Sequence, residues 1–136
     1  MPAPEGTEPI ADDEFVYRRI PVSKEWYTKD GLSPEAFHPR EDETTGISFS
    51  RAKYKTIEEA AKGKGKRGYY VAVLRAGDLR QHGIEVVPRP RRDDPAHAEL
   101  PDLTCHNRKT PEADEKKLRL TELTLRVEGP FPPATA

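Results

Sequence analysis

Several short segments of the chain have the apolar pattern of β-strands. Residues 14–21 are rich in aromatic and β-branched side chains and stop at a proline, and residues 84–88 are also predicted to be a strand. Residues 46–51 alternate, which predicts a half-buried strand with Ile47 and Phe49 facing inward and Ser48 and Ser50 facing outward. Residues 69–74 form a nearly continuous apolar run, which is typical of a central strand covered on both faces.

Other segments carry the signals of short helices. In residues 56–63, Thr56 and Glu59 form a Thr-x-x-Glu capping box and Gly63 can end the helix. Residues 33–37 predict a single helical turn, and residues 76–83 predict another that stops at a glycine. Thr110 and Pro111 can begin a further helix, but the apolar residues of 111–127 change phase and leave open one long helix or a helix followed by a strand.

These elements predict an α+β fold with a small mixed sheet of about four to five strands and two or three short helices. At 136 residues the chain is expected to form one domain. We expect the folded part to span residues 12–128. Residues 1–11 and 129–136 are expected to be flexible or extended tails, because they lack apolar periodicity and are rich in proline.

The composition limits the size of the core and the classes of protein. Only 34% of the residues are hydrophobic, whereas 35% are charged and 14 are proline. No segment approaches the roughly 20 apolar residues that span a bilayer, and no apolar segment near the amino terminus marks export. We therefore predict no membrane association and a cytoplasmic protein. Cys105 is the only cysteine, which excludes an internal disulfide and a site with several cysteine ligands.

Positive charge is concentrated in the middle of the chain. Residues 50–92 contain twelve Lys or Arg but only four acids, whereas the whole chain has a formal net charge of −1. Folding can interleave these charges with acidic side chains, or it can leave a basic face for phosphates, nucleic acid or an acidic partner. The candidate phosphate-binding or nucleic-acid-binding residues are Lys62, Lys64, Lys66, Arg67, Arg89, Arg91 and Arg92.

Residues 63–68 match the string Gly-x-Gly-x-x-Gly, but here a helix precedes the string and a strand follows it. A dinucleotide-binding motif needs the reverse order, so a flexible lysine-rich turn explains the segment better. Candidate metal ligands are His97, Glu99, Cys105 and His106. No histidine pair among them has helical i, i+4 spacing, and we predict no metal site.

His97 and Glu99 are the most informative pair, because they are two residues apart in the run Ala-His-Ala-Glu-Leu at residues 96–100. In a strand, residues i and i+2 share a face. The pair therefore either forms a site or faces water while Ala96, Ala98 and Leu100 cover the core. The preceding proline and the basic loop favour an exposed strand at the edge of the sheet.

Five segments together resemble a family of small uncharacterised bacterial proteins, a resemblance that brings no established activity. They are residues 17–20 (Tyr-Arg-Arg-Ile), 33–37 (Ser-Pro-Glu-Ala-Phe), 46–49 (Gly-Ile-Ser-Phe), 86–88 (Val-Val-Pro) and 96–100 (Ala-His-Ala-Glu-Leu).

An arginine in the first strand, a serine in a second and a glutamate in a late strand also resemble the order in ADP-ribosyltransferase-like enzymes. This resemblance implies that Arg18 or Arg19 holds the phosphates of NAD, that Ser48 positions the substrate and that Glu99 orients the ribose, with His97 adjacent. The chain has Ser-Phe-Ser where that family usually has Ser-Thr-Ser.

Three hypotheses about function follow from the sequence. The first is a non-enzymatic interaction module that binds a protein partner, as an accessory subunit of a larger bacterial assembly and without a cofactor. The high charge, the proline-rich ends and the lack of a strong catalytic motif favour it. The second is an NAD-dependent ADP-ribosyltransferase-like or related phosphate-handling enzyme. The third is a nucleic-acid-binding accessory protein that uses the basic region.

Overall fold

The structure is a computed structural model of the chain, and it describes residues 5–62 and 68–132. The elements follow in the order β1 (Phe15–Pro21), η1 (Val22–Lys24), β2 (Tyr27–Thr28), β3 (Gly31–Leu32), η2 (Pro34–Phe37), β4 (Ile47–Arg51), α1 (Ile57–Ala60), β5 (Tyr69–Arg75), α2 (Ala76–Gln81), β6 (Val87–Pro88), β7 (His97–Leu100), α3 (Pro111–Leu123) and β8 (Arg126–Phe131).

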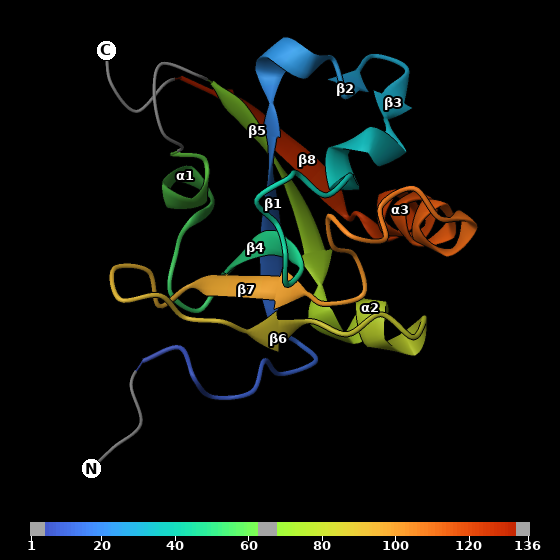
Figure 1. Cartoon of the computed structure of the whole chain (residues 1–136). Helices are drawn as coiled ribbons and strands as arrows, with labels where there is room; N and C mark the ends of the chain where they lie inside the picture. The colour runs from blue at the N-terminus through green and yellow to red at the C-terminus, as the bar shows by residue number, and fades with distance from the viewer. Residues whose placement is uncertain (1–4, 63–67, 133–136) are drawn as a thin grey trace.

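The strands form one six-stranded sheet in the order β6-β7-β4-β1-β5-β8, and β2 and β3 form a separate hairpin. The α+β class is confirmed. The sheet is larger than expected because β7 and β8 both join it, and all of its strand pairs are antiparallel instead of mixed. The strands twist strongly, so that β4 and β7 cross the view of Figure 1 while β1 and β5 run along it.

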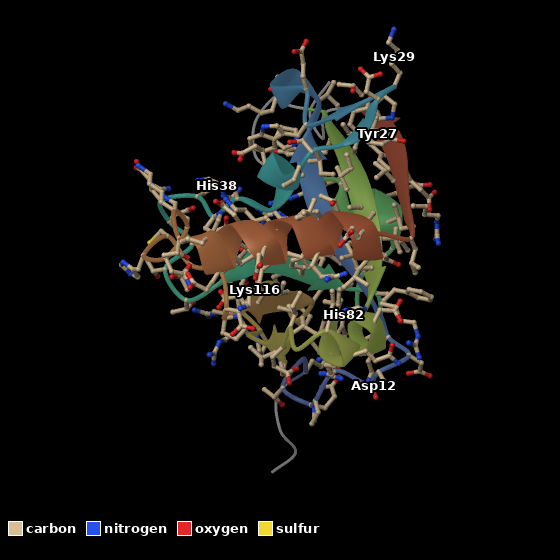
Figure 2. The ribbon with its side chains drawn as sticks, turned by 90° about the vertical axis from the view of Figure 1, so that its right-hand side faces the viewer. Asp12, Tyr27, Lys29, His38, His82 and Lys116 are labelled. Atoms are coloured by element: carbon tan, nitrogen blue, oxygen red, sulfur yellow. The ribbon has the colours of Figure 1, made fainter. Side chains whose placement is uncertain are left out.

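The main core lies between one face of the sheet and helices α2, α3 and η2. In Figure 1 α3 lies on the right of the sheet and α1 on the left, and Figure 2 shows α3 crossing in front of the strands. We call the first side the core face. On β1, β4 and β7 it carries apolar side chains that are almost fully buried, namely Val16, Ile20, Ile47, Phe49, Ala98 and Leu100. They pack with Phe37, Ala113 and Leu120 from the covering helices.

The local capping signals work as the sequence predicts. Thr56 and Glu59 form the reciprocal capping box at the start of α1. The Ser33 side chain caps η2, and Thr110 caps α3 with Pro111 in its first turn. The open alternative at residues 111–127 is resolved as a helix followed by a strand.

Parts of both segments that the sequence predicts to be tails belong to the folded domain. Ile10 is only 2% exposed and belongs to the core, and β8 continues to Phe131 beside β5. Across the described parts of the chain, residues 5–62 and 68–132, no helix combines the length and the apolar character needed to cross a membrane.

Candidate functional site

Strands β4 and β7 bring the predicted serine, histidine and glutamate together on one side of the sheet. In their antiparallel register Ser48 lies opposite Glu99, and Ser50 lies opposite His97. Directly opposed residues share a face, so these four side chains lie on the side away from Ile47 and Phe49. We call this side the polar face, defined by Tyr17, Arg19, Ser48, Ser50, His97 and Glu99.

His97 is held on this face by both of its ring nitrogens. Its Nδ1 atom lies 2.9 Å from the carbonyl oxygen of Arg89, and its Nε2 atom lies 3.3 Å from Ser48 Oγ. The backbone of Arg89 also donates to the His97 carbonyl at 3.0 Å. The ring is thereby fixed between the segment directly after β6 and the serine of β4.

Glu99 has its two carboxylate oxygens in different surroundings. Oε1 accepts a hydrogen bond of 2.7 Å from Thr45 Oγ1 and lies 3.6 Å from Arg89 Nε. Oε2 lies 3.9 Å from His97 Nε2. Ser48, His97 and Glu99 therefore form one cluster, and Thr45 and Arg89 complete its outer side.

The expected edge strand with His97 and Glu99 in water is not what the structure shows. The two residues are only 5% and 7% exposed, although Ala98 and Leu100 do face the core as expected. The reason is tertiary, because β7 lies between β4 and β6 and the Thr45 loop covers Glu99.

Arg18 lies on the opposite face from this cluster. Its Nη1 atom donates to Glu43 Oε2 and to the carbonyl of Ser48, both at 3.0 Å, and its Nε atom donates to the Ala36 carbonyl at 3.1 Å. The amide of Ser48 donates to the same Glu43 oxygen at 2.6 Å. Arg18 and Glu43 thus clamp the backbone of Ser48 from within the core.

The contacts of Arg18 and Glu43 with Ser48 lie just beyond the point where the backbone pairing of β1 with β4 ends. Their pairing covers only Val16 with Arg51 and Tyr17 with Ser50. Burial raises the pKa of Glu43, but the charge and hydrogen bonds of Arg18 outweigh it and hold the pKa below its usual value. Glu43 is therefore a buried ionised acid with a full set of partners.

Arg19 is the first-strand arginine on the polar face, because it alternates with Arg18 and shares the side of Tyr17. Its guanidinium donates to the Lys62 carbonyl at 2.9 Å and lies 5.2 Å from the centre of the Tyr69 ring. It makes no ion pair with any carboxylate in the described chain, and it does not contact Ser48 or Glu99. Partial burial lowers the pKa of Arg19, which marks a partly desolvated cation.

A cleft of about 690 Å³ also opens on the polar face, beginning at Tyr17. This volume falls in the range of roughly 300–1,000 Å³ that is typical of small-molecule sites. Tyr17 is opposite Ser50, and Ser50 is opposite His97, so the cleft and the cluster are two strands apart. Its other lining residues come from 52–59 and β8, and include Lys53, Tyr54, Lys55, Glu58, Glu128 and Phe131.

The basic region does not form one continuous cationic surface in the described chain. Arg51 is fully buried against Glu14, and Arg80 pairs with Asp12 and Glu85. Lys53, Lys55, Arg75 and Arg89 also have carboxylate partners. Lys62, Arg91 and Arg92 are exposed, whereas Lys64, Lys66 and Arg67 lie outside the described residues.

Two residues of the site were missed in the sequence. Thr45 and Glu43 belong to the polar loop of residues 38–45, which has no periodic signal. Their positions depend on long-range contacts with Glu99 and Arg18, which nothing in a local pattern reveals. Within residues 5–62 and 68–132, no three His, Cys, Asp or Glu side chains are grouped so that they could hold a metal ion.

In comparisons with known proteins, no family model, no curated protein and no solved structure matches the chain.

Proposed function

We propose that the chain is an ADP-ribosyltransferase-like enzyme that binds NAD on the polar face of its sheet. The observation that carries this proposal is the pairing of Ser48 with Glu99 in adjacent strands, with Arg19 on the same face of the next strand. The resemblance noted in the sequence implies that an arginine, a serine and a glutamate from these three strands act on one substrate, although the cleft at Tyr17 is lined by none of Arg19, Ser48 and Glu99.

The chemistry of each residue suits a different part of such a substrate. Arg19 offers a partly desolvated guanidinium that makes no ion pair within residues 5–62 and 68–132, which favours the anionic diphosphate. Glu99 and Ser48 offer oxygen atoms for the hydroxyls of the nicotinamide ribose. The cleft at Tyr17 has room for the remainder of the dinucleotide. Arg18 has its donors engaged in the clamp, so we assign it to positioning Ser48.

The test is NAD binding by calorimetry and NAD turnover by nicotinamide release, in the wild type and in Glu99→Gln. We expect the wild type to bind and cleave NAD, and Glu99→Gln to lose roughly 10²- to 10³-fold in turnover, because removing a precisely placed charged group costs about this much. Glu115→Gln, at an exposed position of α3, is the matched control. A wild type that neither binds nor cleaves NAD rejects the proposal.

A protein-interaction module remains the second candidate, and two exposed leucines favour it. Leu118 on α3 is 53% exposed, and Leu125 between α3 and β8 is 50% exposed. Contiguous apolar patches at the surface mark protein interfaces, whereas single exposed apolar side chains are common on any protein surface. This hypothesis expects a co-purifying partner that is lost in the double variant Leu118→Ser/Leu125→Ser, together with no turnover of NAD. A monomer without partners that cleaves NAD contradicts it.

Among the candidate cations that the structure describes, nucleic-acid binding is supported by the exposed side chains of Lys62, Arg91 and Arg92. A gel shift that weakens steeply as salt rises would support it, and Arg91→Ala/Arg92→Ala should then abolish the shift.

A further inference from the structure

Strand β8 is the longer of the two edges of the six-stranded sheet. It is the last strand in the order, and among the described residues no strand pairs with its outer side. Figure 2 shows it as the red strand at the right margin of the molecule. The opposite edge, β6, has only two residues, and one of them is a proline. An exposed edge presents backbone N–H and C=O groups to another strand, so β8 is the edge at which this sheet can be extended.

The regular part of β8 carries one positive and one negative side chain on the same side. The register with β5 and β1 places Arg126 and Glu128 on the polar face, together with Tyr17, and places Val127 on the core face. The Arg126 Nε atom donates to Glu128 Oε2 at 2.7 Å, yet the two side chains are 54% and 38% exposed. Both charges therefore remain accessible to a strand that joins the edge.

These charges are complementary to a second copy of the same strand. When two β8 strands pair antiparallel about a two-fold axis at Val127, Arg126 of each copy lies directly opposite Glu128 of the other. Directly opposed residues share a face, so both charge pairs lie on the polar face. A shift of the axis by one residue in either direction would place two arginines or two glutamates opposite each other. The charge pattern therefore selects one register.

The neighbouring positions also fit this register. Leu125 directly precedes β8 and is 50% exposed. If the register continues by one residue, Leu125 lies opposite Gly129 of the second copy, which is exposed and has no side chain to obstruct it. Val127 lies opposite Val127 of the second copy, and β-branched residues are favourable in cross-strand positions. Apolar contacts therefore accompany the two charge pairs.

We propose that the chain associates with a second copy of itself through β8, so that one antiparallel sheet runs through both copies and Arg126 pairs with Glu128 across the two-fold axis. The edge is short, so the contact is smaller than the standard interface of about 1,600 Å², and the dissociation constant is on the order of 10⁻⁴ M. This association is independent of the proposed function, because it uses neither NAD nor the cluster of Ser48, His97 and Glu99.

Sedimentation equilibrium of the full chain, at concentrations from roughly 10 µM to 1 mM, measures the association. We expect the apparent mass to rise from one chain toward two. Arg126→Glu and Glu128→Arg each place like charges opposite each other, so each should raise the dissociation constant roughly 10-fold or more. The matched controls are Arg119→Glu and Glu122→Arg, which change the net charge equally at an exposed ion pair of α3 and should leave the dissociation constant unchanged.

Mixing the two single variants distinguishes a direct pair from general damage to the fold. One variant presents two glutamates at the edge and the other presents two arginines, so opposite charges again face each other in a mixed pair. We expect the equimolar mixture to regain a dissociation constant within about threefold of the wild-type value, and the double variant Arg126→Glu/Glu128→Arg to do the same. A mixture of Arg119→Glu with Glu122→Arg shows how much attraction the net charges alone provide.

Three results would overturn the proposal. The first is a wild type that stays monomeric up to about 1 mM. The second is a dimer whose dissociation constant changes by less than about threefold in both single variants, because it would use another surface. The third is a mixture of the two single variants that does not associate, with circular dichroism showing that both are folded. NAD binding and turnover bear on none of these results, so this inference and the proposed function can fail separately.

Discussion

Glu43 and Glu99 are both buried glutamates beside an arginine, yet their surroundings differ. Glu43 accepts from Arg18, from the Ser48 amide and from the Arg40 amide, at distances between 2.6 and 3.0 Å. Glu99 has one comparably short contact, from the exposed Thr45, while Arg89 and His97 stay 3.6 and 3.9 Å away. Glu43 accepts three short hydrogen bonds from the protein, whereas Glu99 accepts one. Burial and an arginine neighbour therefore do not by themselves determine how completely a buried acid is hydrogen-bonded.

The largest effect is expected from removing the more completely hydrogen-bonded acid. Glu43→Ala leaves the Arg18 guanidinium buried without its counter-charge and frees the amide of Ser48, so the free energy of unfolding should fall by about 3–5 kcal/mol. Urea denaturation followed by circular dichroism measures the change. Glu41→Ala, two residues away in the sequence and exposed, serves as the control. A loss below about 1 kcal/mol would show that the clamp on Ser48 is not structural.

The two arginines of β1 extend the comparison. Arg18 forms an ion pair with Glu43, whereas Arg19 forms no ion pair with a carboxylate of the described residues. Arg19→Gln should weaken NAD binding by roughly 10- to 100-fold, since a charge-assisted hydrogen bond contributes about 1.5–3 kcal/mol. Its effect on the free energy of unfolding should stay within about 1 kcal/mol. Calorimetric titration and urea denaturation of the same preparation measure both. Unchanged NAD affinity would remove Arg19 from the site.

Low pH should destabilise the folded protein by protonating Glu43. Its pKa in the folded protein is lower than the ordinary value of 4.5, so ionised Glu43 stabilises the fold above that pH. This stabilisation is lost as the pH falls through the lowered pKa, where the folded protein must take up the proton. Urea midpoints between pH 7 and pH 3 should decline less steeply in Glu43→Gln than in the wild type. Parallel declines would show that Glu43 is not a source of the acid sensitivity.

The smallest effect is expected at Arg89. Its side chain is 55% exposed and its approach to Glu99 is long, so Arg89→Ala should change the free energy of unfolding by less than about 1 kcal/mol. The carbonyl that holds His97 belongs to the backbone and survives the substitution. A larger loss of unfolding free energy in the same denaturation assay would mean that Arg89 stabilises Glu99 as strongly as Arg18 stabilises Glu43.

The sequence predicted more of the site than of its surroundings. Alternation predicted that Ser48 faces away from Ile47 and Phe49 and that His97 and Glu99 share one side of their strand, and the structure places all three side chains on the same side of two adjacent strands. The choice between Arg18 and Arg19 could not be made, because adjacent residues point to opposite faces and either register fits the local pattern. Thr45, Glu43 and the carbonyl of Arg89 reach the cluster only through contacts that are distant in sequence.

The sequence by itself determined the features that depend on interactions between nearby residues. The strand periodicity of β1, β4 and β5, the capping box at Thr56 and the start of α3 at Pro111 each depend on interactions within a few residues. The tertiary structure decided the strand order, the burial of His97 and Glu99, and the division of the two first-strand arginines between the core face and the polar face. The physical reason is that periodicity defines two faces of a strand but does not say which neighbours will cover each of them.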